Sequence, residues 1–131
     1  MEKIIAIDET SFSTKERSWG GYEGYQIATD KQIIKMGISG GQSCCENFGY
    51  FMSNDNLSDF IGESITSIKV VDTALNIKDL EEEHLDVEEC MFVNFETTNG
   101  TLQFVAYNSH NGYYGHDAVI ISEQITGSTS L

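Results

Sequence analysis

The sequence predicts one α+β domain of 131 residues, dominated by antiparallel β-sheet and containing one short helix. Its length fits a single domain, for which roughly 100–200 residues is usual. Most apolar residues alternate with polar ones, as in half-buried strands. The chain has 12 glycines and no proline, so we expect Gly and Asn to form the turns. No repeat or linker divides residues 1–131.

Residues 1–71 predict five strands. Lys3–Ile7 is a short run rich in isoleucine. Tyr22–Ala28 and Gln32–Ile38 flank a short polar turn, which favours a hairpin. Cys45–Phe51 is the fourth predicted strand and Ile65–Val71 the fifth.

The predicted helix spans Asn56–Ile61. The polar residues Ser53, Asn54 and Asp55 precede it, and such side chains cap helix N-termini. Gly62 follows it, where a glycine often ends a helix.

The second half predicts a hairpin and a last strand. Met91–Glu96 and Leu102–Tyr107 flank Asn99-Gly100, a pair that suits a type I′ turn because both central residues need positive φ. Ala118–Ser122 is the last predicted strand. Residues 126–131 are small and polar, so we expect a frayed tail.

The distribution of apolar residues and the charge balance exclude several classes of function. No apolar run approaches the roughly 18 residues of a membrane span, and the N-terminus lacks the pattern of a signal peptide. We therefore expect a soluble, cytoplasmic protein with no membrane partner. The 7 basic and 21 acidic residues give a net charge of −14. This argues against direct nucleic-acid binding, since affinity for phosphates comes mostly from Lys and Arg.

The net negative charge concentrates in the second half, because all basic residues precede Asp79. Asp79–Glu89 is the densest stretch, and repulsion should keep it solvated or extended. It is either a solubilising loop or a docking face for a basic partner, where charges would steer encounter. The docking residues would be Glu81, Glu82, Glu83, Asp86, Glu88 and Glu89, with Tyr113 and Tyr114 as aromatic anchors.

Cysteine and histidine residues form a candidate zinc site. The three cysteines argue against a disulfide framework. His110 and His116 bracket a glycine-containing turn and, with one or both of Cys44 and Cys45, could hold one structural zinc ion in tetrahedral geometry. Cys90 is held in reserve. The alternative is a set of buried thiols and turn histidines in ordinary hydrogen bonds.

Enzyme hypotheses have less support. Cys45 and a histidine could form a nucleophile pair, but no nucleophile motif surrounds them. The segments Gly20-Gly21 and Gly40-Gly41 lack the Lys-Ser/Thr of a phosphate loop. We therefore expect no catalytic residues and no enzymatic activity.

Three short elements, in order, resemble a small phage and bacterial family of unknown function. They are Ser43-Cys44-Cys45-Glu46, then Leu57–Gly62, then Asn111-Gly112-Tyr113-Tyr114. The resemblance spans roughly residues 25–123 and implies a shared sheet-rich fold without an activity. Phe60 stands where the family usually has Leu, and His110 and His116 replace small residues, so the zinc hypothesis is this chain's own.

In its size and acidity the chain is also similar to phage-encoded anti-CRISPR inhibitors of type II RNA-guided nucleases, which hold nucleic acid in a positive channel. This resemblance implies an inhibitor that binds such a basic nucleic-acid-handling protein and blocks DNA binding or loading. The alternative is a counter-defence protein that sequesters a nucleotide signal. Backbone N–H groups near Gly40-Gly41 or Gly112 would then hold the anion, with Arg17, Lys31 or Lys35.

Overall fold

The fold is built almost entirely from antiparallel strands. The computed structural model describes residues 2–13, 21–39, 48–53, 56–75, 77–82, 85, 90–108, 117–123 and 125–131. The strands are β1 (Glu2–Phe12), β2 (Tyr22–Thr29), β3 (Ile33–Ser39), β4 (Phe48–Met52), β5 (Ser64–Val71), β6 (Cys90–Thr97), β7 (Gly100–Asn108), β8 (Asp117–Ile121) and β9 (Thr126–Ser130). The helical elements are the 3₁₀ turn η1 (Leu57–Phe60) and α1 (Ile77–Glu82).

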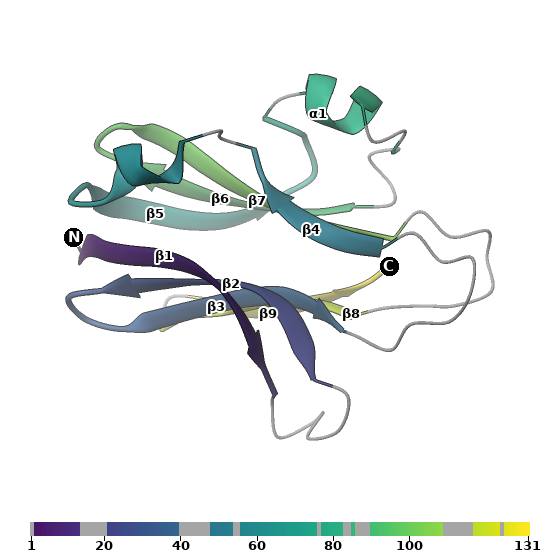
Figure 1. The fold of residues 1–131 in the computed structure, drawn as a ribbon, viewed down its shortest axis with the longest axis horizontal. Coiled ribbons are helices and arrows are strands. Elements are labelled where there is room, and N and C mark those ends of the chain that lie inside the picture. Colours follow the sequence, from purple (N-terminus) through teal and green to yellow (C-terminus); the bar gives the residue numbers. More distant parts are fainter. Residues whose placement is uncertain are drawn as a thin grey trace.

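The strands form one sheet that folds into two layers. Their order is β4-β7-β6-β5-β1-β2-β3-β8-β9. β1 joins the two layers: it pairs with β5 only through Glu2 and Lys3, and with β2 from Ile4 to Phe12. The first layer therefore contains β1, β2, β3, β8 and β9, and the second contains β4, β7, β6 and β5 (Figure 1).

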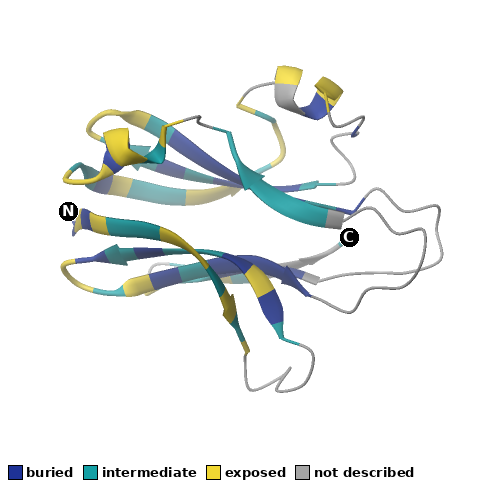
Figure 2. Ribbon diagram, in the orientation of Figure 1, coloured by how far each residue is buried: buried dark blue, intermediate teal, exposed yellow. Residues whose placement is uncertain are grey.

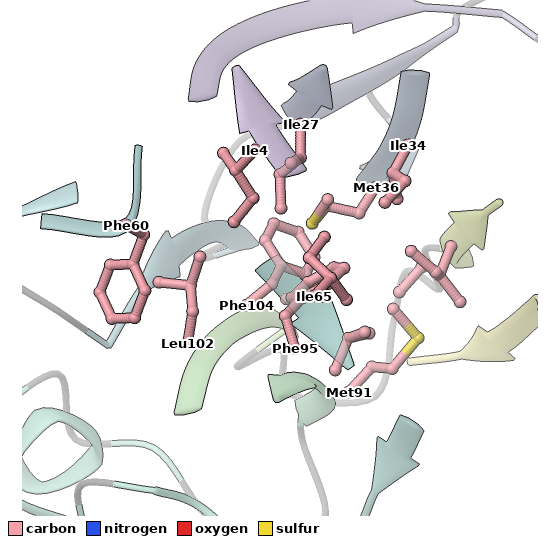
Figure 3. Close-up of a cluster of buried hydrophobic side chains, with 14 of the residues drawn as sticks. Ile4, Ile27, Ile34, Met36, Phe60, Ile65, Met91, Phe95, Leu102 and Phe104 are labelled. Carbon is pink, nitrogen blue, oxygen red and sulfur yellow. The ribbon is translucent and has the colours of Figure 1, made fainter. Parts of the chain in front are cut away.

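The main hydrophobic core lies between the layers. In β3 the inward residues Ile34 and Met36 are fully buried, while Ile33, the first residue of the strand, is exposed, as the period-two geometry of a strand requires. Phe95 and Phe104 face them from the second layer (Figure 3). Figure 2 shows that the buried residues follow the facing strands of both layers. This core fixes which side chains of each strand point inward.

A second, smaller core covers the outer face of the second layer. Leu80 of α1 and Leu85 pack against Phe92 and Val105, and all four are buried. α1 therefore lies over β6 and β7, on the side away from the first layer (Figure 1).

A buried glutamine attaches the segment before α1 to the sheet. Gln103 on β7 is fully buried. Its Nε2 donates to the carbonyl oxygen of Thr73 at 3.0 Å and to Oδ1 of Asn94 at 2.7 Å. Its Oε1 accepts from the N–H of Leu75 at 2.8 Å. These bonds satisfy a polar side chain whose burial would otherwise be costly.

The predicted antiparallel, sheet-dominated fold is confirmed, but the α+β label fits only roughly. The predicted helix at Asn56–Ile61 is the four-residue 3₁₀ turn η1. Gly62 follows it with φ of +90°, a conformation that glycine adopts without strain, so its predicted role in ending the element is confirmed.

The hairpin between β6 and β7 has a different turn from the predicted one. Thr97 pairs with Gly100, so Thr98 and Asn99 are the residues between them, rather than Asn99-Gly100 as the central pair. Gly100 follows with φ of +94°. A glycine adopts this positive φ just after the turn without the strain that a side chain would add.

The C-terminal tail is a strand. Residues 126–131 were expected to be frayed, whereas Thr126–Ser130 forms β9 and pairs with β8 along its length. The side chain of Asn108 donates to the carbonyl oxygen of Leu131 at 3.1 Å, which ties the end of the chain to β7. Backbone pairing orders this segment despite its few apolar side chains.

Candidate functional site: an acidic helix and an aromatic–carboxylate cluster

The acidic segment, expected to be solvated or extended, begins in a helix. α1 contains Glu81 and Glu82, both exposed. Buried Leu80 holds this helix on the sheet, and the N–H of Leu85 donates to the carbonyl oxygen of Leu80 at 2.9 Å. The segment is therefore helical and not extended over Asp79–Glu82, where apolar contacts outweigh repulsion, whereas the expected solvation is seen at Glu81 and Glu82. Four further docking residues lie outside the described residues: Glu83, Asp86, Glu88 and Glu89.

The predicted metal ligands and aromatic anchors all lie outside the described residues. These are Cys44, Cys45, His110 and His116 for the metal, and Tyr113 and Tyr114 for the partner. Cys90, the reserve ligand, is half-buried and packs against the second core. Among the residues that the structure does describe, no group of three or more His, Cys, Asp or Glu side chains could hold a metal ion.

Three aromatic rings from both layers meet in a cluster that sequence reasoning missed. Tyr25 of β2 lies edge-to-face with Tyr50 of β4, with ring centroids 5.5 Å apart and an interplanar angle of 89°. Phe104 of β7 is 6.3 Å from each tyrosine ring and is fully buried. Both tyrosines are half-buried. Phe104 is therefore shielded from water, whereas the two tyrosines remain partly exposed.

Two glutamates border this cluster. Glu9 on β1 pairs directly with Tyr25, and Glu23 lies two residues before Tyr25 on the same face of β2. Both carboxylates are exposed, although this face continues into the core at Ile27. The paired ends of β1 and β2 curve away from the second layer (Figure 1).

The glutamates affect the ionisation of both tyrosines. Burial raises the pKa of Tyr25 above its usual 10.0, and the charge of Glu9 and a hydrogen bond to it raise it further. Burial also raises the pKa of Tyr50, with added contributions from Glu9 and Glu23. Each shift has the sign expected when negative charge opposes formation of a phenolate. The cluster is therefore a region of negative potential with neutral hydroxyl groups.

The aromatic–carboxylate cluster has a weak signal in the sequence. Glu23, Tyr25 and Ile27 are every second residue of β2, so their side chains lie on the same face of the strand. Because Ile27 is in the core, the pattern predicts an apolar side chain at position 23, where the chain has a glutamate. The approach of Tyr50 depends on how the layers pack, which strand periodicity does not specify. We name Glu9, Glu23, Tyr25, Tyr50 and Phe104 the aromatic–carboxylate cluster.

Two of the lysines considered for anion binding, Lys31 and Lys35, lie within the described residues. Lys31 is exposed in the turn between β2 and β3. The Nζ of Lys35 lies 5.9 Å from the centroid of the Phe12 ring. Lys35 pairs with Gln26, on the face of β2 opposite Tyr25. The other residues of that hypothesis, Arg17, Gly40, Gly41 and Gly112, lie outside the described residues.

Comparison with known proteins identifies a family whose function is unknown. Within the described part of the chain, no helix is long and apolar enough to cross a membrane. Neither the curated proteins nor the solved structures contain a match to the chain. A family model described as a domain of unknown function, DUF7448, matches residues 1–120. The chain therefore belongs to the DUF7448 family.

Proposed function

We propose that the protein is an inhibitor that binds a basic, nucleic-acid-handling protein through its acidic surface. The observation that carries this proposal is the display of exposed carboxylates on a packed scaffold, within a chain of net charge −14. Electrostatic complementarity of this kind accelerates encounter and selects partners of opposite charge. The same charge disfavours nucleic acid itself as the ligand.

The attachment of α1 supports a defined docking surface. Leu80 is 2% exposed, whereas its neighbours Glu81 and Glu82 are exposed. The hydrogen bonds of Gln103 hold the backbone at Thr73 and Leu75, just before the helix. A partner would therefore meet carboxylates whose backbone is already positioned, which lowers the entropy lost on binding.

The specific partner that we propose is a type II RNA-guided CRISPR nuclease. Such nucleases hold the guide–target duplex in a positively charged channel. An acidic protein in that channel would block DNA binding or loading in the cytoplasm of the host cell. The proposed role is binding alone, without catalysis.

The test is a binding assay between the full chain and such a nuclease, at low and high salt. We expect retention at low salt and weaker retention at high salt, because screening reduces the attraction. Absence of binding at every salt concentration would overturn the proposal.

Association kinetics test the role of the acidic segment. The triple variant Glu81→Gln, Glu82→Gln, Glu83→Gln should slow association more than it speeds dissociation, because steering acts on the encounter step. The matched control removes three exposed charges elsewhere: Asp8→Asn, Asp72→Asn and Glu123→Gln. We expect the control to slow association less. Equal rates for the parent and the acidic-segment variant would exclude this segment as the docking face.

A further inference from the structure

We propose that the aromatic–carboxylate cluster is a receptor site for one arginine side chain of a basic protein partner. The inference rests on the proposed function and deepens it, because it assigns a second contact on a part of the molecule distant from α1. α1 covers the outer face of the second layer, whereas Tyr25 and Tyr50 meet between the layers.

The arrangement of the rings suits a planar cation. The edge-to-face contact between Tyr25 and Tyr50 directs the rim of one ring at the face of the other. Tyr50 is stacked with Phe104 at an interplanar angle of 25°, and Phe104 itself is fully buried. Both tyrosines are half-buried, and an aromatic face carries the negative part of the ring quadrupole, on which guanidinium groups stack.

The carboxylates complete the recognition of a guanidinium group. Glu9 and Glu23 are exposed beside the rings, and both act on the Tyr50 hydroxyl electrostatically. Within the described residues, no lysine or arginine forms an ion pair with either glutamate. A guanidinium group has five N–H donors and no acceptor, so it matches two acceptor-only carboxylates next to aromatic faces.

Other occupants match this chemistry less well. An anion would be repelled by the same carboxylates that raise the two tyrosine pKa values. A metal ion would need more ligands than this cluster offers, since no metal-holding group occurs among the described residues. Lys35, which contacts Phe12, extends from the opposite face of the first layer. Arginine uses both the rings and the carboxylates.

The direct test follows the ring signals of Tyr25 and Tyr50 by NMR during titration of the full chain with N-acetyl-arginine amide at low salt. We expect saturable shifts of both rings. The same derivative of lysine should bind more weakly, because its ammonium group lacks the planar fork of donors. The neutral glutamine derivative should leave both rings unshifted. Unshifted rings in the presence of the arginine probe would overturn the inference.

Charge-matched variants separate a local site from general acidity. Glu9→Gln with Glu23→Gln should weaken arginine binding about tenfold, the scale expected for losing charge-assisted hydrogen bonds. Asp72→Asn with Glu123→Gln removes the same charge at exposed positions outside the cluster and should leave the affinity within about twofold of the parent. Equal weakening by the two pairs would contradict a local site.

Tyrosine variants test the role of the rings. Tyr50→Phe keeps the aromatic face and should retain most of the affinity, whereas Tyr50→Leu should lose it. The dispersion of the amide spectrum shows whether each variant is folded, and the Phe variant gives a result even if the Leu variant unfolds. Strong binding by a folded Leu variant would exclude the ring as a contact.

The failure of this inference and the failure of the proposed function are distinguishable. If the full chain binds a basic nuclease but Glu9→Gln with Glu23→Gln has no effect on that complex, only the arginine site is excluded. If the cluster binds arginine but no basic nuclease is retained at any salt concentration, the proposed partner is excluded and the site remains.

Discussion

The two tyrosines that bridge the layers illustrate how a single residue responds to its surroundings. Tyr25 and Tyr50 are partly removed from water and lie beside carboxylates, and both effects oppose ionisation. We expect both to ionise above the usual value of 10.0. A titration of tyrosine absorbance should therefore lose its most alkaline component in the variants Tyr25→Phe and Tyr50→Phe.

These raised pKa values also predict how stability depends on pH. A raised folded-state pKa means that the unfolded chain releases its tyrosine protons first, so the contribution to stability is complete below about 10 and is lost as pH rises further. Glu9→Gln should lower the pKa of both tyrosines towards the usual value while burial keeps it above that value. An unchanged alkaline titration in this variant would show that Glu9 does not act on the rings.

At the scale of elements, local patterns predicted those strands whose apolar residues alternate. The hairpin of β2 and β3 follows from two strand-like apolar runs around a polar turn, and its pairing is confirmed. β1 extends to Phe12, well beyond the predicted Lys3–Ile7, because Asp8–Phe12 gain backbone partners on β2 rather than burial. β9 likewise forms by pairing with β8. Pairing partners are distant in the sequence, so composition does not reveal them.

The sequence pattern did not predict α1, because its few apolar residues are scattered among carboxylates. Among the described residues of the acidic run, Leu80 and Leu85 are the ones that pack in the second core. Two leucines five residues apart do not make a helical stripe. The outer face of β6 and β7, with Phe92 and Val105, supplies the surface that stabilises the helix.

This account of α1 predicts a large difference between two leucines. Leu80→Ala should lower the free energy of unfolding by about 2–5 kcal/mol, because it leaves a cavity in a buried cluster. Leu75→Ala is the matched control, since Leu75 is 47% exposed and should cost less than about 0.5 kcal/mol. Urea unfolding measures both. Similar costs for the two variants would contradict the packing of α1 on the sheet.

At the scale of the whole molecule, the sequence indicated sheet content but not the two-layer arrangement. β1 joins the layers through only two residue pairs with β5, a detail that depends on tertiary packing. The aromatic–carboxylate cluster arises from that arrangement, because Tyr25 and Tyr50 belong to different layers. The zinc hypothesis stays a prediction, since Cys44, Cys45, His110 and His116 lie outside the described residues.

The net charge of −14 has a consequence for the folded molecule as a whole. Folding brings the carboxylates closer together, so their mutual repulsion opposes the compact state. Salt screens this repulsion: the Debye length falls from about 30 Å at about 0.01 M to about 8 Å at about 0.15 M. We therefore expect the thermal midpoint to rise by several degrees over this range of sodium chloride.

Potassium chloride should give the same rise, which separates screening from a specific effect of sodium. In the variant Glu81→Gln, Glu82→Gln, Glu83→Gln the net charge falls in magnitude, so the midpoint should start higher and increase less with salt. Differential scanning calorimetry measures both quantities. A midpoint that falls with salt would mean that ion pairs outweigh repulsion in the native state, and the surplus of carboxylates would then be neutralised within the fold and not be available to a cationic partner.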